Sequence, residues 1–288
     1  MRRILVLGAG FAGLWAAIGA ARKLDELGVP QGEVEILVVD RNPYHNIRVR
    51  NYEVDLDDVA LPLASLLDPV GIRHMTAEVC AIDPVKQQVT LAASQDSNGG
   101  REILSYDRLV LTLGSQLARP PIEGLSTFGF DVDTYAAAVR LNDHLAALGR
   151  LEPSPQRATV VVVGAGFTGI EVAAEMPAKL AKANIAAPRV ILVDPNSTLG
   201  AAIGEAGRPV VDEALTALGI ETRLAVKASA VNGDGITLSS GRVHSGANRG
   251  VVWRHESKSA GRCAGWGARP LWPARRRPLH ARERGQER

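Results

Sequence analysis

Two glycine-rich stretches have the residue types and spacing of a phosphate-binding turn. Both read G-x-G-x-x-G, and each follows an apolar run and precedes a segment of small residues. The glycines are Gly8, Gly10 and Gly13 in the first copy and Gly164, Gly166 and Gly169 in the second. In this motif the first glycine permits a tight turn, the second lets the backbone approach a pyrophosphate, and the third lets helix and strand pack closely. The N–H groups at the helix N-terminus then favour the phosphate charge.

A carboxylate follows each glycine motif at the distance expected of a residue that binds a ribose diol. Asp40 ends the run VEILVVD, 27 residues after Gly13, and Asp194 ends the run RVILVD, 25 residues after Gly169. Both separations are close to the spacing of roughly 20 residues in dinucleotide-binding sequences. Either copy alone could be a tight turn without a ligand. Two copies, each in its full context, indicate dinucleotide binding.

The elements needed to position these residues also occur twice. RILVLGAGFAGLWAA starts at Arg3 and TVVVVGAGFTGIEVAA starts at Thr159, and each reads as a strand, a turn and a helix. The first helix should have about fourteen residues, the second should run through Leu180, and an apolar strand should follow each. Residues 4–21 carry no charge and could be read as a membrane segment, but their glycines favour a strand joined to a helix. We therefore predict an α/β protein with two Rossmann-like, three-layer dinucleotide-binding domains.

Composition argues against several other kinds of protein. The 288 residues are 46% hydrophobic and 22% charged, as in a globular chain with room for about two domains. Cys80 and Cys263 lie 183 positions apart, which excludes a disulfide framework and a cysteine-rich metal site. The six histidines are scattered, and we expect no metal. Only 4% of the residues are aromatic, so we expect no stacking platform for nucleic acid.

With these motifs the chain resembles the two-dinucleotide-binding-domain flavoproteins of the pyridine nucleotide-disulfide oxidoreductase superfamily, and within them the type II NADH dehydrogenase-like group. The resemblance covers about residues 1–245. It implies that the first motif and Asp40 bind FAD and that the second motif and Asp194 bind NADH. YDRLVLTLGSQ resembles the strand that closes the first part of the family's FAD domain, where Thr112 and Gly114 would approach the flavin nucleotide.

The second motif carries two further expectations from this resemblance. GFTGIEVAAE is similar to the family's NAD-side sequence, which places Glu171 near the nicotinamide and implies a catalytic role; a solvent-facing helix charge is the alternative. Asp194 would repel a ribose 2′-phosphate, and no cation follows it before Arg208, so NADH is expected over NADPH. In the first domain, Tyr44 and His45 lie where the family brings a loop near the flavin.

The stretch after the first acid distinguishes between branches of the superfamily. It reads RNPYHNIRVRNYE and lacks the cysteine pair that disulfide reductases place there. Cys80 stands alone and is expected as a small core residue. Without a cysteine pair, direct hydride transfer from NADH to flavin is the mechanism that remains. This reaction requires two rings aligned at about 3–3.5 Å and no acid–base triad. The resemblance indicates a quinone as the final acceptor, and a ferredoxin-reductase-like flavoprotein is an alternative.

Charge and motif content change near the C-terminus. We expect an FAD-binding domain at 1–125, a NAD(P)H-binding domain at 126–245 and a tail at 246–288, with net charges of −6 before the tail and +8 within it. A tail of this kind can bind nucleic acid or anionic lipid, be a disordered extension or be out-of-frame translation, and we favour the last. The family's C-terminal strand, Gly-Asp and helix are missing, because Gly233-Asp234 reads as a hairpin between two β runs.

This departure from the family pattern has consequences for function and location. The sequence predicts an FAD domain without its C-terminal part, in a truncated or frameshifted chain. A non-catalytic remnant that binds nucleotide but holds FAD poorly is therefore a second hypothesis. We expect a cytoplasmic protein, with peripheral contact to the inner face of the membrane through the missing region, and a homodimer.

Overall fold

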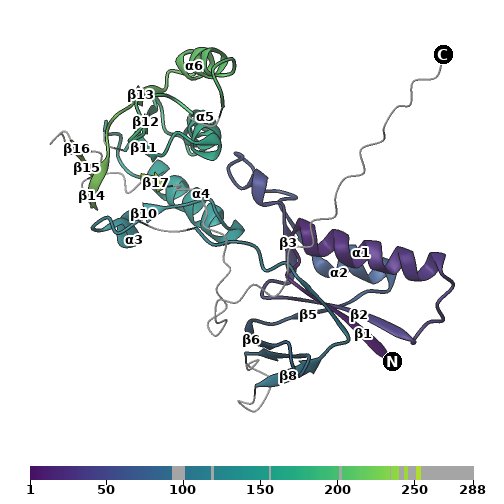
Figure 1. The fold of residues 1–288 in the computed structure, drawn as a ribbon. Helices are drawn as coiled ribbons and strands as arrows, with labels where there is room; N and C mark the ends of the chain where they lie inside the picture. The colour runs from purple at the N-terminus through teal and green to yellow at the C-terminus, as the bar shows by residue number, and fades with distance from the viewer. Residues whose placement is uncertain are drawn as a thin grey trace, which may run out of the picture.

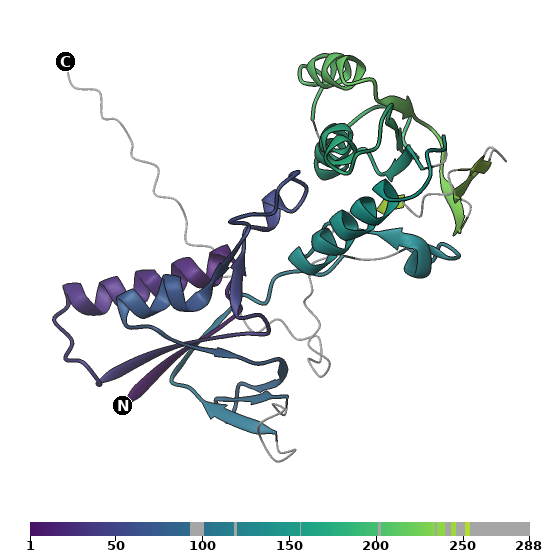
Figure 2. The same cartoon turned by 180° about the vertical axis from the view of Figure 1, so that it is seen from behind.

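The described residues form two units of the same kind in the computed structural model (Figure 1). The structure describes residues 1–92, 101–117, 120–155, 157–200, 203–233, 235–239, 243–245 and 251–253. In each unit a parallel sheet is covered by helices on one face and by a small antiparallel sheet on the other. The view from behind shows the two units side by side, joined through the segment that leads into α4 (Tyr135–Gly149) (Figure 2).

The first unit is built on a parallel sheet with the strand order β5-β2-β1-β9. Its strands are β1 (Arg2–Leu7), β2 (Val34–Asp40), β5 (Arg73–Thr76) and β9 (Arg108–Leu111). β1 and β2 pair in parallel along their length, from Arg2 opposite Val34 to Leu7 opposite Val39. Both strands are nearly continuous apolar runs, as expected for a parallel sheet that is covered on both faces.

Alternate residues of β1 point into two different cores. The covering elements are α1 (Phe11–Glu26) and α2 (Leu63–Leu67) on one face, and β6 (Val79–Asp83), β7 (Gln88–Leu91) and β8 (Glu102–Ser105) on the other. Val6 belongs to the core beneath the helices, whereas Leu5 and Leu7 belong to the core beneath the antiparallel strands. All three are 0% exposed, and each such side chain contributes about 1.5–3 kcal/mol to folding.

The second unit repeats this design with the strand order β10-β17-β11-β12-β13. Its strands are β10 (Gly129–Phe130), β11 (Thr159–Val163), β12 (Arg189–Val193), β13 (Glu221–Arg223) and β17 (Val251–Trp253). The covering elements are α4, α5 (Phe167–Lys182) and α6 (Arg208–Ala217) on one face, and α3 (Leu125–Phe128), β14 (Ala228–Asn232), β15 (Gly235–Leu238) and β16 (Val243–Ser245) on the other. Val160 and Val162 pack under the helices, and Val161 and Val163 pack on the opposite core.

A loop between the units leaves the first sheet after β2. It contains the antiparallel pair β3 (Tyr44–Asn46) and β4 (Ala60–Pro62), the 3-10 turn η1 (Arg48–Arg50) and, beyond α2, the turn η2 (Asp68–Val70). Residues 47–58 of this loop, here called the bridging loop, extend toward α4 and α5 of the second unit (Figure 1).

The predicted repeat of strand, turn, helix and strand is confirmed in both units. The strand that ends at Asp40 has the predicted bounds, and both helices have sixteen residues. The predicted hairpin is also confirmed, since β14 and β15 pair antiparallel with Asn232 opposite Gly235; Asp234 lies outside the described residues. No helix among the described residues combines the length and apolar composition that a bilayer crossing requires.

The structure differs from the sequence-based expectations at Cys80 and at the start of the predicted tail. Cys80 was expected in the core and is exposed, so that prediction is wrong; the pairing of β6 with β7 shifts register between Val79 and Ala81, and the shift leaves the intervening side chain outside the core. β17 comes from the stretch assigned to the tail, yet it pairs with β10 and β11 in the second sheet. Residues 254–288 lie outside the described residues, and with them most of the predicted tail.

Candidate functional site

Each unit has a tight glycine turn between its first strand and its first helix. Gly8 has a φ of +100° and Gly164 a φ of +106°, which side chains disfavour. A Cβ on Gly13 would lie 1.8 Å from the carbonyl oxygen of Gly8, and one on Gly169 would lie 1.7 Å from that of Gly164. The first and third glycines are therefore required by the fold of each turn.

The second glycine of each motif has a different environment. A Cβ on Gly10 or on Gly166 would meet no atom within 4 Å. These residues are the N-caps of α1 and α5, and neither helix has a side-chain cap. By contrast, the Thr134 hydroxyl caps α4 and accepts a hydrogen bond from the Ala137 N–H at 3.2 Å. Open space beside an uncapped helix N-terminus fits a pyrophosphate at both turns.

The two predicted carboxylates are bonded to their own glycine turns. The Ala9 N–H donates to Oδ2 of Asp40 at 2.7 Å, and the Ala165 N–H donates to Oδ2 of Asp194 at 2.5 Å. In both units Oδ1 accepts the backbone N–H two residues further along, at 2.8 Å. A carboxylate has about four acceptor positions, so each can still accept a bond from a ribose hydroxyl. The internal repeat thus extends from the sequence to individual hydrogen bonds.

The end of β9 supports the first turn. The hydroxyl of Thr112 lies 2.8 Å from the carbonyl oxygen of Leu7 and 3.1 Å from that of Gly8, so it can donate to this backbone. A Cβ on Gly8 would lie 2.2 Å from the Thr112 carbonyl oxygen. Gly114 follows with a φ of +73°, which turns the chain away from the strand. The structure therefore brings Thr112 to the first turn, where its hydroxyl contacts protein backbone.

The loop that carries Tyr44 and His45 also reaches the first turn. His45 is buried, and its Nδ1 lies 2.7 Å from the carbonyl oxygen of Ala9. The His45 ring lies edge-on to the ring of Phe11, with 4.9 Å between ring centroids. The Tyr44 ring instead meets Tyr135 at the start of α4, with 5.5 Å between centroids. This loop therefore contacts both the first glycine turn and the second unit.

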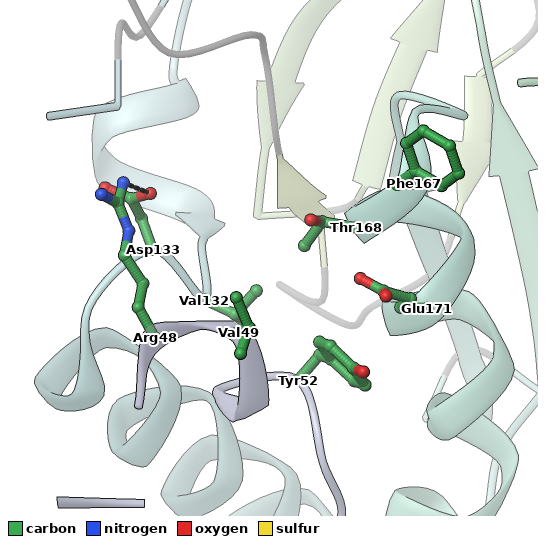
Figure 3. A pocket seen from close by; sticks show the side chains of 8 residues that line it. All are labelled: Arg48, Val49, Tyr52, Val132, Asp133, Phe167, Thr168 and Glu171. Carbon is green, nitrogen blue, oxygen red and sulfur yellow. Dashed lines mark hydrogen bonds and ion pairs between the residues drawn. The ribbon is translucent and has the colours of Figure 1, made fainter. Parts of the chain in front are cut away.

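The two units meet at a cavity of about 340 Å³. Figure 3 shows its walls, which come from the bridging loop, the segment before α4 and the start of α5. The lining residues are Arg48, Val49, Tyr52, Val132, Asp133, Phe167, Thr168 and Glu171. Phe167 and Thr168 follow Gly166 directly, so the cavity adjoins the second glycine turn. The structure brings Glu171 to this cavity, which disfavours the alternative of a helix charge directed only at solvent.

Charged and polar groups fix two sides of this cavity. Arg48 forms an ion pair with Asp133, and its Nη1 also donates to the Ser115 hydroxyl at 3.1 Å. Across the cavity lie the Tyr52 phenol and the Glu171 carboxylate (Figure 3). Burial is the main cause of the raised pKa of Tyr52, and the negative charge of Glu171 raises this pKa further. The phenol is therefore protonated near neutral pH.

Sequence reasoning identified Glu171 but missed Arg48, Tyr52 and Asp133. In the stretch that holds the first two, the sequence predicts roles only for Tyr44 and His45 and lacks a cysteine pair, and it gives the third no role. Their roles depend on contacts between residues 85 and 119 positions apart in the chain. An arginine and an aromatic residue in the loop after the first acid were the available signal, and by themselves they have no specific meaning; Asp133 lies in a separate segment before α4.

Comparisons with known proteins agree with this architecture. An NADH dehydrogenase-like protein of Mycobacterium tuberculosis is 49% identical over 257 residues, covering 88% of this chain and 62% of that protein. A demethylphylloquinone reductase of Synechocystis is 29% identical over 241 residues, covering 82% of this chain and 57% of that protein. The chain thus spans less than two thirds of the length of these relatives.

Solved structures show the same fold at low sequence identity. The NDH2 of Plasmodium falciparum matches with a TM-score of 0.72 and 15% identity, covering 89% of this chain and 55% of that one. A NAD-dependent persulfide reductase from A. fulgidus matches with a TM-score of 0.70 and 21% identity, covering 91% and 47%. The family model for pyridine nucleotide-disulphide oxidoreductases matches residues 2–253. This chain therefore belongs to the pyridine nucleotide-disulphide oxidoreductase family.

Proposed function

We propose that this chain is an FAD-dependent NADH oxidoreductase that passes electrons on to a quinone. The observation that carries the proposal is the pair of matching glycine turns, each with an open second glycine and a carboxylate bonded to the turn. Two such turns in one chain accommodate two dinucleotides, and the second turn adjoins the cavity between the units. The relatives named NADH dehydrogenase-like and type II NADH:quinone oxidoreductase support the same activity.

The first unit, within residues 1–125, would hold FAD. Gly10 leaves room for the pyrophosphate, and Asp40 is placed at the turn to accept a ribose hydroxyl. Thr112 supports the turn and Gly114 redirects the chain beside it, which is the side on which the flavin nucleotide would lie. FAD bound here would supply the two-electron acceptor for hydride.

The second unit, residues 126–245 together with β17, would hold NADH. Gly166 leaves room for its pyrophosphate, and Asp194 is a buried, hydrogen-bonded carboxylate at the adjacent turn. A ribose 2′-phosphate beside this charge would be repelled, whereas a 2′-hydroxyl could donate to it. Asn196, whose side chain and N–H both bind Asp194, offers no positive charge to a phosphate. These contacts favour NADH over NADPH.

Residues of the cavity would orient the nicotinamide. Glu171 presents an acceptor that can bind the amide N–H groups of a carboxamide, at a site reached directly from Gly166. Val49, Val132 and Phe167, of which Val132 is buried, would offer apolar contacts to the ring. The chain therefore contributes binding and orientation, as expected for a reaction whose chemistry belongs to its cofactors.

Quinone is proposed as the final acceptor because relatives of this chain have that word in their names. The Synechocystis protein is named a demethylphylloquinone reductase, and a protein of Staphylococcus haemolyticus is named a type II NADH:quinone oxidoreductase. A one-electron carrier is the competing acceptor. The rates of NADH oxidation with a soluble quinone and with a one-electron carrier distinguish the two.

The test begins with the purified chain. An absorbance band near 450 nm, bleached by NADH and restored by a quinone, is the expected result. A colourless protein that binds NADH and does not take up added FAD would reduce the proposal to a nucleotide-binding remnant. A protein that binds neither nucleotide would refute it. Dissociation constants for NADH and NADPH, measured side by side, test the expected preference for NADH.

A further inference from the structure

Arg48 lies in the bridging loop on a part of the backbone that is held in place from both sides. It begins the turn η1, whose base is closed by the side-chain amides of Asn46 and Asn51, which bind each other at 2.9 and 3.2 Å. The Ile47 N–H also donates to the carbonyl oxygen of Val59 at 2.8 Å. The direction in which Arg48 leaves the loop is therefore fixed by the fold of the loop itself.

The Arg48 guanidinium binds the connection between the units, residues 112–134, near both of its ends. On the side of the first unit, Nη1 lies 3.2 Å from the carbonyl oxygen of Ser115 and 3.1 Å from its hydroxyl. On the side of the second unit, Nη2 forms an ion pair with the Asp133 carboxylate, drawn as a dashed line in Figure 3. The other carboxylate oxygen, Oδ2, accepts the Leu117 N–H at 3.2 Å. One ion pair thus joins the segment that leaves the first unit to the segment that enters the second.

The two joined segments lead to the two proposed cofactor sites. The hydroxyl of Thr112, three residues before Ser115, lies 3.1 Å from the carbonyl oxygen of Gly8 in the first glycine turn. On the other side, Asp133 lines the cavity that adjoins the second glycine turn, and Thr134 next to it caps α4. A continuous series of contacts and short chain segments therefore runs from the first turn, through this ion pair, to the cavity.

The partners of Arg48 favour a role in holding protein segments over a role in binding a ligand anion. Both terminal nitrogens of the guanidinium bind protein groups, and the charge is neutralised by Asp133, whose side chain is 7% exposed. A guanidinium can hold two partners at once because its N–H groups form a rigid planar fork. Arg48 uses this fork to bind two segments that are separated by 18 positions in the chain.

We propose that Arg48 is a positioning residue that, together with Asp133, fixes the first unit relative to the second. The proposal rests on the proposed function, in which the first unit holds FAD and the second holds NADH. Hydride transfer requires reacting atoms about 3–3.5 Å apart, and a misplacement of about 1 Å can slow a reaction about 100-fold. Loss of Arg48 should therefore slow the reduction of the flavin, while NADH binding, which depends on the second glycine turn, should change little.

The first experiment measures the relative placement of the units without any nucleotide. Asp25→Cys on α1 and Glu213→Cys on α6, both at exposed positions, carry spin labels in a chain with Cys80→Ser and Cys263→Ser. Pulsed electron paramagnetic resonance then gives the distribution of distances between the two labels. Adding Arg48→Met should make this distribution about twofold wider, because units without a fixed contact move relative to each other. A distribution of unchanged width would overturn the proposal.

Two further variants control for effects on folding. Arg48→Met leaves the Asp133 carboxylate without its cation, which destabilises the fold, whereas Arg48→Met with Asp133→Asn removes both charges together. A folded double variant should show the same wide distribution, and a narrow one would refute the role of the ion pair. Arg189→Met breaks an arginine–glutamate pair within the second unit and is the matched control, whose distribution should stay narrow. Thermal unfolding of each variant checks the fold.

The second experiment separates flavin reduction from NADH binding. In a single turnover at saturating NADH, Arg48→Met should slow the bleaching of the flavin band by about tenfold or more. The NADH dissociation constant should rise by less than about threefold, as expected where the loss is confined to the chemical step. Weaker NADH binding with an unchanged rate of bleaching would overturn the positioning role, since Arg48 would then be a binding residue.

The outcomes distinguish this proposal from the proposed function. A wild-type chain that holds neither FAD nor NADH would refute the function, and the distance measurement, which needs no nucleotide, would still decide whether Arg48 fixes the units. A flavin that NADH reduces equally fast in the wild type and in Arg48→Met would support the function and overturn the role of Arg48 alone.

Discussion

Alanine substitutions at Gly166 and Gly169 should separate the ligand-binding role of the second glycine turn from its structural role. The two residues lie three positions apart on the same turn. A Cβ on Gly169 would lie 1.7 Å from the carbonyl oxygen of Gly164, where contacts under 3.0 Å are not tolerated. A Cβ on Gly166 would meet nothing within 4 Å, and the residue has an extended backbone with φ −73° and ψ 174° that alanine can adopt.

The magnitudes follow from these distances. For Gly169→Ala the helix must move away from the turn by more than 1 Å, and such overpacking costs about 1–3 kcal/mol or more. In a unit of this size that lowers the Tm by roughly 4–10 °C. In Gly166→Ala, alanine is a poorer helix N-cap than glycine, which destabilises the fold by about 1 kcal/mol. Alanine also restricts the unfolded chain more than glycine does, which stabilises the fold by about 0.4–1 kcal/mol. Its net effect on stability should be within about 1 kcal/mol.

Nucleotide binding should show the opposite order. The added methyl group of Gly166→Ala occupies the space through which a pyrophosphate would approach the backbone, so NADH affinity should fall by more than about tenfold in a protein that is still folded. Calorimetric titration with NADH and thermal unfolding of the same samples provide both readouts. Wild-type NADH affinity in Gly166→Ala, or equal thermal destabilisation by both substitutions, would refute this interpretation of the turn.

Three further predictions concern charge. Burial lowers the pKa of Lys179 to about 8, so between about pH 8 and pH 10.5 the unfolded chain binds a proton that the folded chain does not. The free energy of unfolding, measured in urea, should therefore rise by about 2–3 kcal/mol by pH 10. Lys179→Met should lack this increase. Asp194→Asn should narrow the NADH-over-NADPH affinity ratio by about tenfold, and an unaltered ratio of dissociation constants would contradict the proposed repulsion. Hydrogen bonding to Arg189 lowers the pKa of Glu221 to about 2, so the stability that the Glu221 carboxylate contributes is lost as the pH falls from about 4.5. Both side chains are more than 40% exposed, which weakens this contribution. Glu221→Gln should therefore reduce the difference in unfolding free energy between pH 7 and pH 3 by less than about 1 kcal/mol.

The glycine turns could be predicted because the constraints on them are local. A tight turn that requires positive φ at Gly8, and a helix that packs within contact of that turn at Gly13, leave a recognisable spacing in the sequence. The same holds for the hairpin at β14 and β15, where turn residues lie between two short apolar runs. Each of these patterns is decided within a segment of about thirty residues, so one sequence is sufficient.

The cavity could not be predicted, because it depends on contacts between distant segments. Tyr52 and Glu171 lie 119 positions apart in the chain and line the same cavity because the bridging loop packs against the core of the second unit. The failure at Cys80 has a similar cause, since a register shift in a short antiparallel sheet decides which side of the strand faces the core. In both cases the residue type permits several environments, and tertiary packing selects one.

The internal repeat also shows where the two units have diverged. The position seven residues after the first glycine is Trp15 in α1 and Glu171 in α5. Trp15 is 68% exposed, whereas Glu171 lines the cavity, as Tyr52 does. The turns themselves kept the same hydrogen bonds, down to the N–H that each carboxylate accepts. Since the two turns fit the same chemical group, the units differ in the helix residue that follows the turn and in the loop that faces it. In the second unit this residue is a carboxylate that lines a cavity shared with the neighbouring unit.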